Sequence, residues 1–281
     1  MEKLIQYATK GAYYDGRFDS VVGWAAAGMG YILVTRNRKL VVIDGGNRED
    51  GEDFLALLRK YGGEEPAVDL WIMTHPHLDH YGALLALAGR EERPALAIRK
   101  LAYAFPRAFR NAKGEGIEEA FLHFDLIRKA FPSEIRRPLT GEVMDVDGMK
   151  IEFFFTPDDV TILDNPNQLS LIFQVTGEKK KVLFTGDAYR RNLEIVLWRE
   201  GEEKLRSDVL QMPHHGLCDT GYAPFYRAVG AKTLLIPISI AGDRTMHSDA
   251  YGDEPADNLF AERNAERILK AFEGTREIAL A

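Results

Sequence analysis

The stretch from residue 72 to residue 82 constrains this chain more than any other. It follows an apolar run over 68–73 that is typical of a buried strand, and within six residues it holds three histidines and an aspartate: His75, His77, Asp79 and His80. Neutral imidazole and carboxylate are ligands of zinc and its first-row neighbours. Pro76 disfavours helix and sheet ladder at this point, and the apolar run from Tyr81 predicts a helix. The sequence therefore predicts a metal-binding loop between a strand and a helix.

The spacing within this loop can serve two ions. His75 and His77 lie two residues apart, so in an extended segment they point the same way and can share one ion. Asp79 and His80 are offset and can serve a second ion. A single histidine is more often a surface or packing residue, but three of the seven histidines of the chain stand here.

Composition bounds the remaining possibilities. A chain of 281 residues with 46% hydrophobic residues can form one large domain or two ordinary ones. A net charge of −7 argues against a general nucleic-acid or membrane-surface binder, although a local nucleic-acid patch stays open. One cysteine, Cys218, excludes an internal disulfide framework and fits a reducing compartment. With no apolar leader or run of about 18 apolar residues, we expect a soluble, cytoplasmic protein without a membrane partner.

The coarse pattern alternates strands and helices. Strands are predicted over 21–27, 31–35, 39–43, 68–73, 143–146, 150–155, 169–175, 182–184, 208–212 and 233–238. Helices are predicted over 50–61, from 82, over 190–199, and from 258 through 272, with a loop over 241–257.

Residues 96–137 differ from their surroundings. They combine six aromatic residues with nine Lys or Arg and five acidic residues, and 117–130 has helical spacing. One interpretation is a solvated helical insertion with its aromatic side chains packed inward. The other is a cap over the site whose basic groups attract a phosphate or another anion. His123 within this helix is expected to pack rather than to bind a ligand.

Other potential ligands also follow apolar strands. Asp44 ends the strand over 39–43 beside two glycines, where it either forms a turn or orients a metal-binding histidine through a hydrogen bond. Asp187 follows the strand over 182–184, and His214 and His215 follow the strand over 208–212. Because strand ends meet at one edge of a layered α/β fold, these residues are expected to converge. The expected ligands are His75, His77, Asp79, His80, Asp187 and one of His214 and His215.

These elements together resemble the metallo-β-lactamase superfamily of hydrolases. The resemblance rests on the HxHxDH form of residues 75–80, the strand-end Asp44, Thr185-Gly186-Asp187 and the late histidine. "LFTGDA" followed by "MPHHG" is most similar to the branch that includes the hydrolase domain of the DNA-uptake protein ComEC. The resemblance implies an α/β fold, a four-layer αββα sandwich of two similar halves, formed by a single domain over 1–281 with the 96–137 insertion.

The resemblance also implies the roles of the ligands. His75 and His77 would hold one metal, Asp79 and His80 a second, and Asp187 would bridge both. The late ligand falls on His214 or His215, of which His214 is favoured. Most members have a further histidine near the position where Asn165 and Asn167 stand, and this difference opens the first metal position.

The function that follows is metal-assisted hydrolysis. Two divalent ions, zinc or else manganese, would hold a bridging hydroxide that Asp79 orients and whose proton it moves. The expected substrate is a phosphodiester or another small anionic ester. The alternatives are a carboxylic ester, thioester or lactone hydrolase, and a metal-binding module with a degenerate site. His247, on a loop after a strand, either faces the substrate or is solvated, and Cys218 is expected to be an inert thiol.

Overall fold

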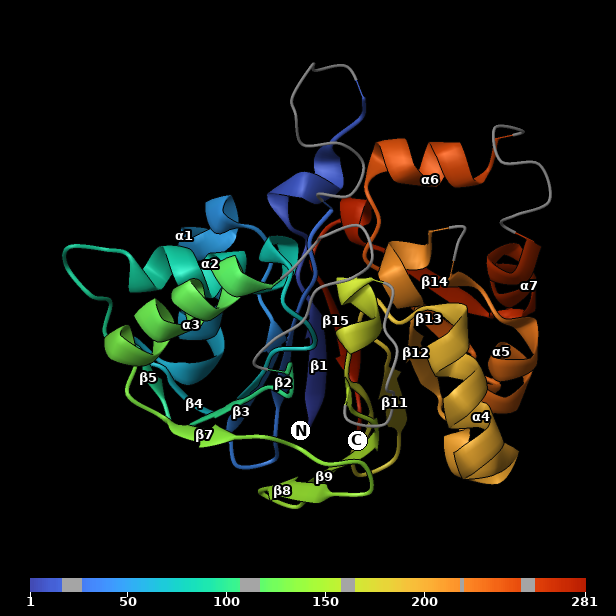
Figure 1. The fold of residues 1–281 in the computed structure, drawn as a ribbon, viewed down its shortest axis with the longest axis horizontal. Coiled ribbons are helices and arrows are strands. Elements are labelled where there is room, and N and C mark those ends of the chain that lie inside the picture. Colours follow the sequence, from blue (N-terminus) through green and yellow to red (C-terminus); the bar gives the residue numbers. More distant parts are fainter. Residues whose placement is uncertain (17–26, 107–116, 158–164, 218–219, 249–255) are drawn as a thin grey trace.

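The computed structural model describes residues 1–16, 27–106, 117–157, 165–217, 220–248 and 256–281. Its centre is a pair of sheets that face each other (Figure 1). The first sheet has the strand order β15 (Arg276–Ala279), β1 (Lys3–Gln6), β2 (Gly30–Val34), β3 (Leu40–Asp44), β4 (Ala67–Ile72), β6 (Lys100–Ala102) and β7 (Glu134–Arg136), with β5 (Ala97–Ile98) also beside β4. The second has the order β14 (Arg267–Lys270), β13 (Thr233–Ile236), β12 (Val209–Gln211), β11 (Lys181–Phe184), β10 (Ile172–Thr176), β9 (Met149–Phe155) and β8 (Val143–Val146).

Helices cover the outer faces of both sheets (Figure 1). The first sheet is covered by α1 (Gly51–Gly62), α2 (Leu78–Ala88) and α3 (Glu118–Ala130). The second is covered by α4 (Arg190–Leu205), α5 (Ala223–Val229) and α7 (Ala256–Asn264), while α6 (Ile240–Met246) lies near the edge that carries η1 (Lys10–Tyr13). The four-layer α/β sandwich predicted from the sequence is confirmed.

Strand β3 shows how the sequence produces these layers. Successive side chains of a strand point to opposite faces, so a fully apolar strand is buried on both. Val42 packs in the core between the first sheet and its helices, whereas Val41 and Ile43 pack in the core between the sheets. A third core lies between the second sheet and its helices and includes Leu183 and Leu193.

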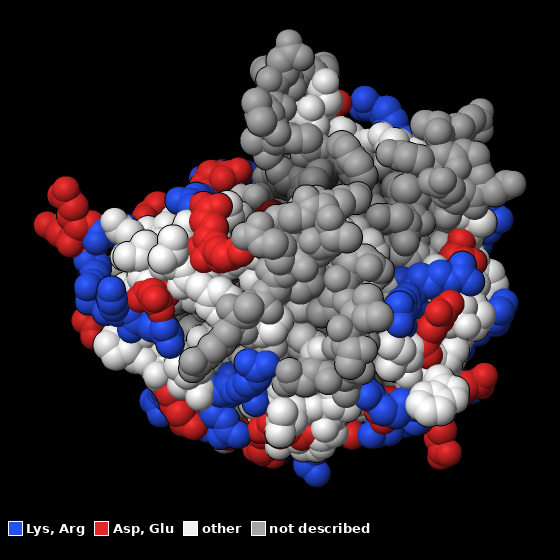
Figure 2. Space-filling model, in the orientation of Figure 1, with Lys and Arg blue, Asp and Glu red and all other residues white. Residues whose placement is uncertain are grey.

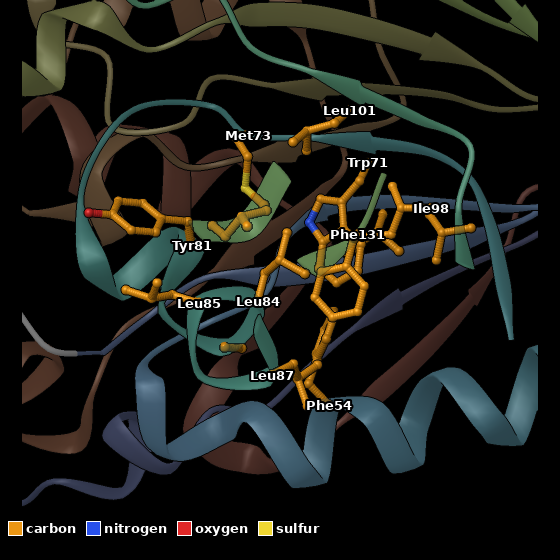
Figure 3. Close-up of a cluster of buried hydrophobic side chains, with 14 of the residues drawn as sticks. Phe54, Trp71, Met73, Tyr81, Leu84, Leu85, Leu87, Ile98, Leu101 and Phe131 are labelled. Carbon is orange, nitrogen blue, oxygen red and sulfur yellow. The ribbon is translucent and has the colours of Figure 1, made fainter. Parts of the chain in front are cut away.

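The core beneath the first sheet reaches the strand ends. Phe54 of α1, Trp71 of β4 and Leu84 of α2 lie together in it (Figure 3). The indole Nε1 of Trp71 donates a hydrogen bond of 2.8 Å to the backbone oxygen of Asp44. The packing of this core therefore fixes the position at which β3 ends.

The strand directions bring the predicted loops to one edge. Strands β3 and β4 are parallel, as are β11 and β12, so within each pair the carboxyl ends lie at the same edge of the sheet. The segments that follow these four strands contain all the expected metal ligands. The topology thus positions the candidate site.

The segment 96–137 contains more than the expected helix. Its described residues form the helix α3, packed on α2, and three short strands, β5 to β7, that extend the first sheet in parallel. Strands of two or three residues are too short for alternation to be recognised in the sequence. Residues 107–116 of the proposed cap lie outside the described residues.

The C-terminal part also differs from the prediction. The expected loop over 241–257 contains α6, and the expected closing helix from 258 ends at Asn264. Leu269 lies in strand β14 rather than in that helix, because parallel pairing with β13 buries it between the sheets. The predicted strand over 21–27 lies almost entirely outside the described residues. In the described part of the chain, no helix has the length and apolar character needed to cross a membrane.

Candidate metal centre

The loop between β4 and α2 and the first turn of α2 carry the first four candidate ligands. Strand β4 ends at Ile72, and the chain then runs through Thr74 and His75, both fully buried, to Pro76. His77 is extended, with φ −105° and ψ 143°, and stands just before the first residue of α2. Asp79 and His80 follow in the first turn of this helix. The change from strand to helix turns the side chains on both sides of it toward one place.

Six candidate ligand residues gather there in two groups that share Asp187. His75, His77 and Asp187 form one group, and Asp79, His80, Asp187 and His215 form the other, each with its ligand atoms within 4.8 Å of one another. Asp187 Oδ2 lies 3.6 Å from His75 Nε2, 3.2 Å from His80 Nε2 and 3.4 Å from His215 Nε2. His215 Nε2 also lies 3.2 Å from Asp79 Oδ2. One carboxylate therefore stands between two sets of imidazoles.

The hydrogen bonding of the buried histidines leaves their ligand atoms free. His80 Nδ1 lies 2.8 Å from a carboxylate oxygen of Asp44, and His215 Nδ1 lies 2.7 Å from the backbone oxygen of Pro237. Because these partners only accept, both Nδ1 atoms carry hydrogen, and a neutral ring then has its lone pair on Nε2. The Nε2 atoms of His75, His80 and His215 are buried and have no hydrogen-bond partner among the described residues, and the same is true of Asp187 Oδ1. Lone pairs that converge in this way fit a divalent cation.

The electrostatics of the two groups differ. Burial alone would lower the pKa values of His80 and His215, but Asp187 and Asp79 outweigh it, raising the pKa of His80 well above its ordinary value and that of His215 to about 10. Burial would raise the pKa of Asp187, but the neighbouring histidines hold it well below its ordinary value. For His75 and His77, burial dominates and lowers both pKa values. The first group thus offers neutral imidazoles, whereas in the second a metal must replace protons.

Asp44 holds the residues that carry the ligands in place through hydrogen bonds. It is fully buried, has a left-handed backbone with φ 54°, and accepts hydrogen bonds from Thr74 N at 2.8 Å and Thr74 Oγ1 at 2.7 Å. Together with its contact to His80, these bonds occupy both carboxylate oxygens. Asp44 therefore fixes the orientation of the His80 ring and the path of the chain toward His75.

The loop that carries Asp187 is held from two sides. Gln211 Oε1 accepts from the backbone N–H groups of Thr185 and Gly186, both at 2.8 Å, and Asp187 N donates to Ser170 Oγ at 2.9 Å. Gly186 has φ 54°, and a Cβ there would lie 2.9 Å from Ser170 Oγ. Only glycine fits this approach without a shift of its neighbours.

His214 lies beside the centre but outside both ligand groups. The structure brings His215 into the second group, although the sequence favoured His214. Both have left-handed backbones, with φ 46° and 57°, so strand alternation does not extend to this pair. The Nε2 atom of His214 lies 3.1 Å from Asn167 Nδ2 instead.

Asn165 and Asn167 stand on the same side as His214. Asn165 Oδ1 accepts from Asn167 N at 2.8 Å and so caps the short helix η5 (Pro166–Leu169). The amide nitrogens of both residues contact Tyr189 Oη, at 3.2 and 3.4 Å. Asn167 Oδ1 is buried and has no hydrogen-bond partner among the described residues.

His247 is not part of either group. It ends α6, where its ring contacts the backbone oxygen of Asp243 at 2.8 Å and Glu262 Oε2 at 3.2 Å. His123 packs as expected, with Nδ1 2.9 Å from Tyr81 Oη. Cys218 lies outside the described residues.

Comparison with known proteins agrees with this geometry. The profile described as the Metallo-beta-lactamase superfamily matches residues 31–220, which include every member of both ligand groups. The chain belongs to this superfamily. It is accordingly a metal-dependent hydrolase with a metallo-β-lactamase fold. A comparison with curated proteins finds no significant sequence match.

Solved structures share the fold at low identity. Zn²⁺-bound PqqB from Methylobacterium extorquens has a TM-score of 0.58 and 10% identity, with 99% of this chain and 100% of that chain covered. The metallo-β-lactamase-fold protein YhfI from Bacillus subtilis has a TM-score of 0.54 and 16% identity, with coverages of 99% and 100%. A diphosphatase from the PhnP family has a TM-score of 0.51 and 15% identity, with coverages of 99% and 98%.

Some residues that build the centre of this metallo-β-lactamase-fold hydrolase were not found from the sequence. Gln211 and Ser170 hold the Asp187 loop, and Thr74 links Asp44 to the histidine loop. Each is a buried polar residue in or next to an apolar strand, which is the one signal in the sequence that could have identified them. Tyr189 follows Asp187 by two residues and carried no such signal.

Proposed function

We propose that this protein is a dinuclear hydrolase of phosphodiesters or other small anionic esters. The observation that supports this most directly is the pair of ligand groups that share Asp187. In this proposal His75, His77 and Asp187 hold the first ion, and Asp79, His80, Asp187 and His215 hold the second. Zinc suits these nitrogen and oxygen donors, and manganese is the alternative.

Asn167 is proposed to serve the first ion as well. That position has three donors against four at the second. The Oδ1 atom of Asn167 is a buried acceptor without a described partner, while its nitrogen is held by Tyr189 and His214. His214 is close enough for its charge to lower the pKa values of His75 and His77, so the asparagine stands on their side of the centre. An amide oxygen would supply the donor that most members take from histidine.

In this proposal the residues around the ions have different roles in hydrolysis. Two divalent ions bound here would act as Lewis acids and lower the pKa of a water molecule toward neutrality. Asp79 has a side chain that is 17% exposed, against 2% or less for His75, His80, Asp187 and His215. It therefore reaches the side from which substrate and water arrive, where it can orient the attacking water and accept its proton. His80 and His215 remain fixed by Asp44 and Pro237.

The preference for a phosphate substrate rests on the fold and on the sequence. The diphosphatase of the PhnP family has the same fold, and the ComEC-like elements of the sequence favour the same chemistry. In the proposed cap, Arg99, Arg128 and Arg136 pair with acidic neighbours. On the face that Figure 2 shows, basic and acidic side chains of the described residues are interspersed. A small anionic substrate therefore fits better than a nucleic acid. A cytoplasmic location stays a prediction.

Metal content and turnover together test the proposal. Elemental analysis of the purified protein should give two metals per chain. Bis-p-nitrophenyl phosphate should be hydrolysed with added zinc or manganese, faster than p-nitrophenyl acetate. The Asp187→Ala variant should lose metal and turnover, whereas His247→Ala, outside both groups, should keep them.

Each other result identifies a different function. Two metals with turnover of only the acetate would favour the carboxylic ester, thioester or lactone hydrolase. Metal without any turnover would favour the metal-binding module with a degenerate site. Absence of both under every supplementation would overturn the proposal.

A further inference from the structure

A cavity lies at the opposite edge of the second sheet from the metal centre. Its volume is about 320 Å³, at the lower end of the range of small-molecule sites, about 300–1,000 Å³. It is formed where β12 and β13 begin and α5 and α7 end, whereas His215 follows the carboxyl end of β12. Figure 1 shows these four elements together on the side of the second sheet that α4 also covers. The cavity is therefore separate from the metal centre.

The cavity combines an apolar inner wall with a basic outer wall. The inner wall consists of the buried residues Leu210, Leu234 and Ala261, and Phe260 adds an aromatic ring. The outer wall carries the exposed cations Arg206, Arg227 and Lys232, and no Asp or Glu is among the described lining residues. This composition is unusual for a chain with a net charge of −7.

The two guanidinium groups are available to a ligand. Neither Arg206 nor Arg227 takes part in an ion pair with a described residue, whereas Lys232 pairs with Glu266 at 3.2 Å. The guanidinium carbon of Arg227 lies 5.2 Å from the ring centroid of Phe260, and this stacking holds the group while leaving its N–H donors free.

Both arginines lie at the last turn of α5. Arg227 belongs to that turn, and a Cβ on the following Gly230 would lie 3.5 Å from Arg206 Nη1. Both residues line the same cavity, and the planar donors of a guanidinium group match the oxygen atoms of a phosphate group.

We propose that this cavity binds a small organic phosphate. Its phosphate group would lie on Arg206 and Arg227, and its apolar or aromatic part would lie against Phe260, Leu210 and Leu234. The cavity volume limits the ligand to the size of an aryl phosphate or a nucleoside monophosphate. The site does not depend on the proposed hydrolysis, since none of its residues contributes to the metal centre.

Calorimetry with phenylphosphonate, which lacks an ester bond, tests this site. The full chain is titrated as purified and again with excess chelator, so that binding at the metal centre is separated from binding here. Binding of equal affinity is expected in both conditions. The variants Arg206→Gln and Arg227→Gln should each weaken it at least tenfold, because each removes charge-assisted hydrogen bonds. Arg263→Gln, an exposed position of α7 outside the cavity, is the matched control and should bind like the original chain.

Three results would overturn the proposal. Binding that disappears with the chelator would belong to the metal centre. Equal binding by the Arg206→Gln, Arg227→Gln and control variants would place the ligand elsewhere. Absence of binding at millimolar phenylphosphonate would mean that the basic groups serve only the carbonyl ends of α5 and α7, where cations are favoured without a ligand.

Discussion

The Nδ1 atom of His80 lies 2.8 Å from Oδ2 of Asp44, and both residues are fully buried. This contact joins the end of β3 to the first turn of α2. It also fixes the ring so that Nε2, on the opposite side, faces Asp187 at 3.2 Å. Asp44 therefore sets the orientation of the candidate ligand His80, although Asp44 itself belongs to neither ligand group.

Substitution of Asp44 should weaken metal binding without removing a ligand. In Asp44→Asn, an amide replaces the charge that holds the Nδ1 proton of His80, and removal of such partners typically lowers metal affinity 10–100-fold. Competition with a chelator measures the change. Asp147→Asn is the matched control, because Asp147 also has a left-handed backbone, with φ 57°, but among the described residues its carboxylate accepts hydrogen bonds only from Thr35 and Asn37. Equal affinities in the two variants would contradict this role.

Substitution of His215 should change the metal content of the protein, whereas substitution of His214 should not. His215→Asn should lose the metal of the second group, because it removes a ligand atom 3.2 Å from Asp79 and 3.4 Å from Asp187. His214→Asn should retain two metals per chain by elemental analysis. Asparagine tolerates the left-handed backbone at both positions, so strain is matched. Loss of metal in the His214 variant alone would reverse the assignment.

Asn167 should determine the first metal position. Asn167→Ala is expected to lose the ion of the first group, which reduces the metal content toward one per chain. Asn167→His should bring the metal content back to two per chain. Asn165→Ala serves as the comparison, because it removes the cap of η5 and should cost about 1 kcal/mol of stability with both metals kept. If Asn167→Ala kept two metals of unchanged affinity, its oxygen would not be a ligand.

Metal affinity should rise with pH. With a pKa of about 10, His215 carries a proton on both ring nitrogens in the metal-free protein at neutral pH, and binding must release one. Each released proton raises the apparent affinity tenfold per pH unit below that pKa. Chelator competition at pH 6.5, 7.5 and 8.5 measures the slope, and a flat profile would exclude the protonated state.

The stability of the metal-free protein should change in the opposite direction. A folded-state pKa above the ordinary value of about 6.5 means that the folded chain binds the His215 proton more tightly than the unfolded chain. That stabilisation is fully present below pH 6.5 and is lost as the pH rises toward 10. Urea denaturation across this interval in the presence of chelator should show the decline.

Much of the centre could be predicted because its residues follow apolar strands. Parallel pairing of β3 with β4 and of β11 with β12 brings their ends to one edge, so Asp44, the histidine loop and Asp187 converge for a reason visible in the sequence. The choice between His214 and His215 was not predictable, since two left-handed residues in succession break the alternation on which such reasoning depends. The two-residue strand β5 and the pairing that places Leu269 in β14 depend on distant partners. The local sequence pattern therefore does not predict either strand.

Gly186 offers a test of how tightly the bridging carboxylate is positioned. A Cβ at this residue would meet Ser170 Oγ at 2.9 Å and Thr74 Cβ at 3.1 Å, and φ is 54°. Gly186→Ala should therefore displace the loop that carries Asp187, cost about 1–3 kcal/mol of stability and reduce metal content. Gly201→Ala has a comparable φ of 72° but nothing within 4 Å of its Cβ, so it isolates the backbone strain from the steric contact. Urea denaturation and elemental analysis of the two variants separate these causes. Equal destabilisation of the two variants, with full metal content in both, would show that the Asp187 loop can shift without loss of metal. Close packing around Gly186 would then not be what holds Asp187 between the two ligand groups.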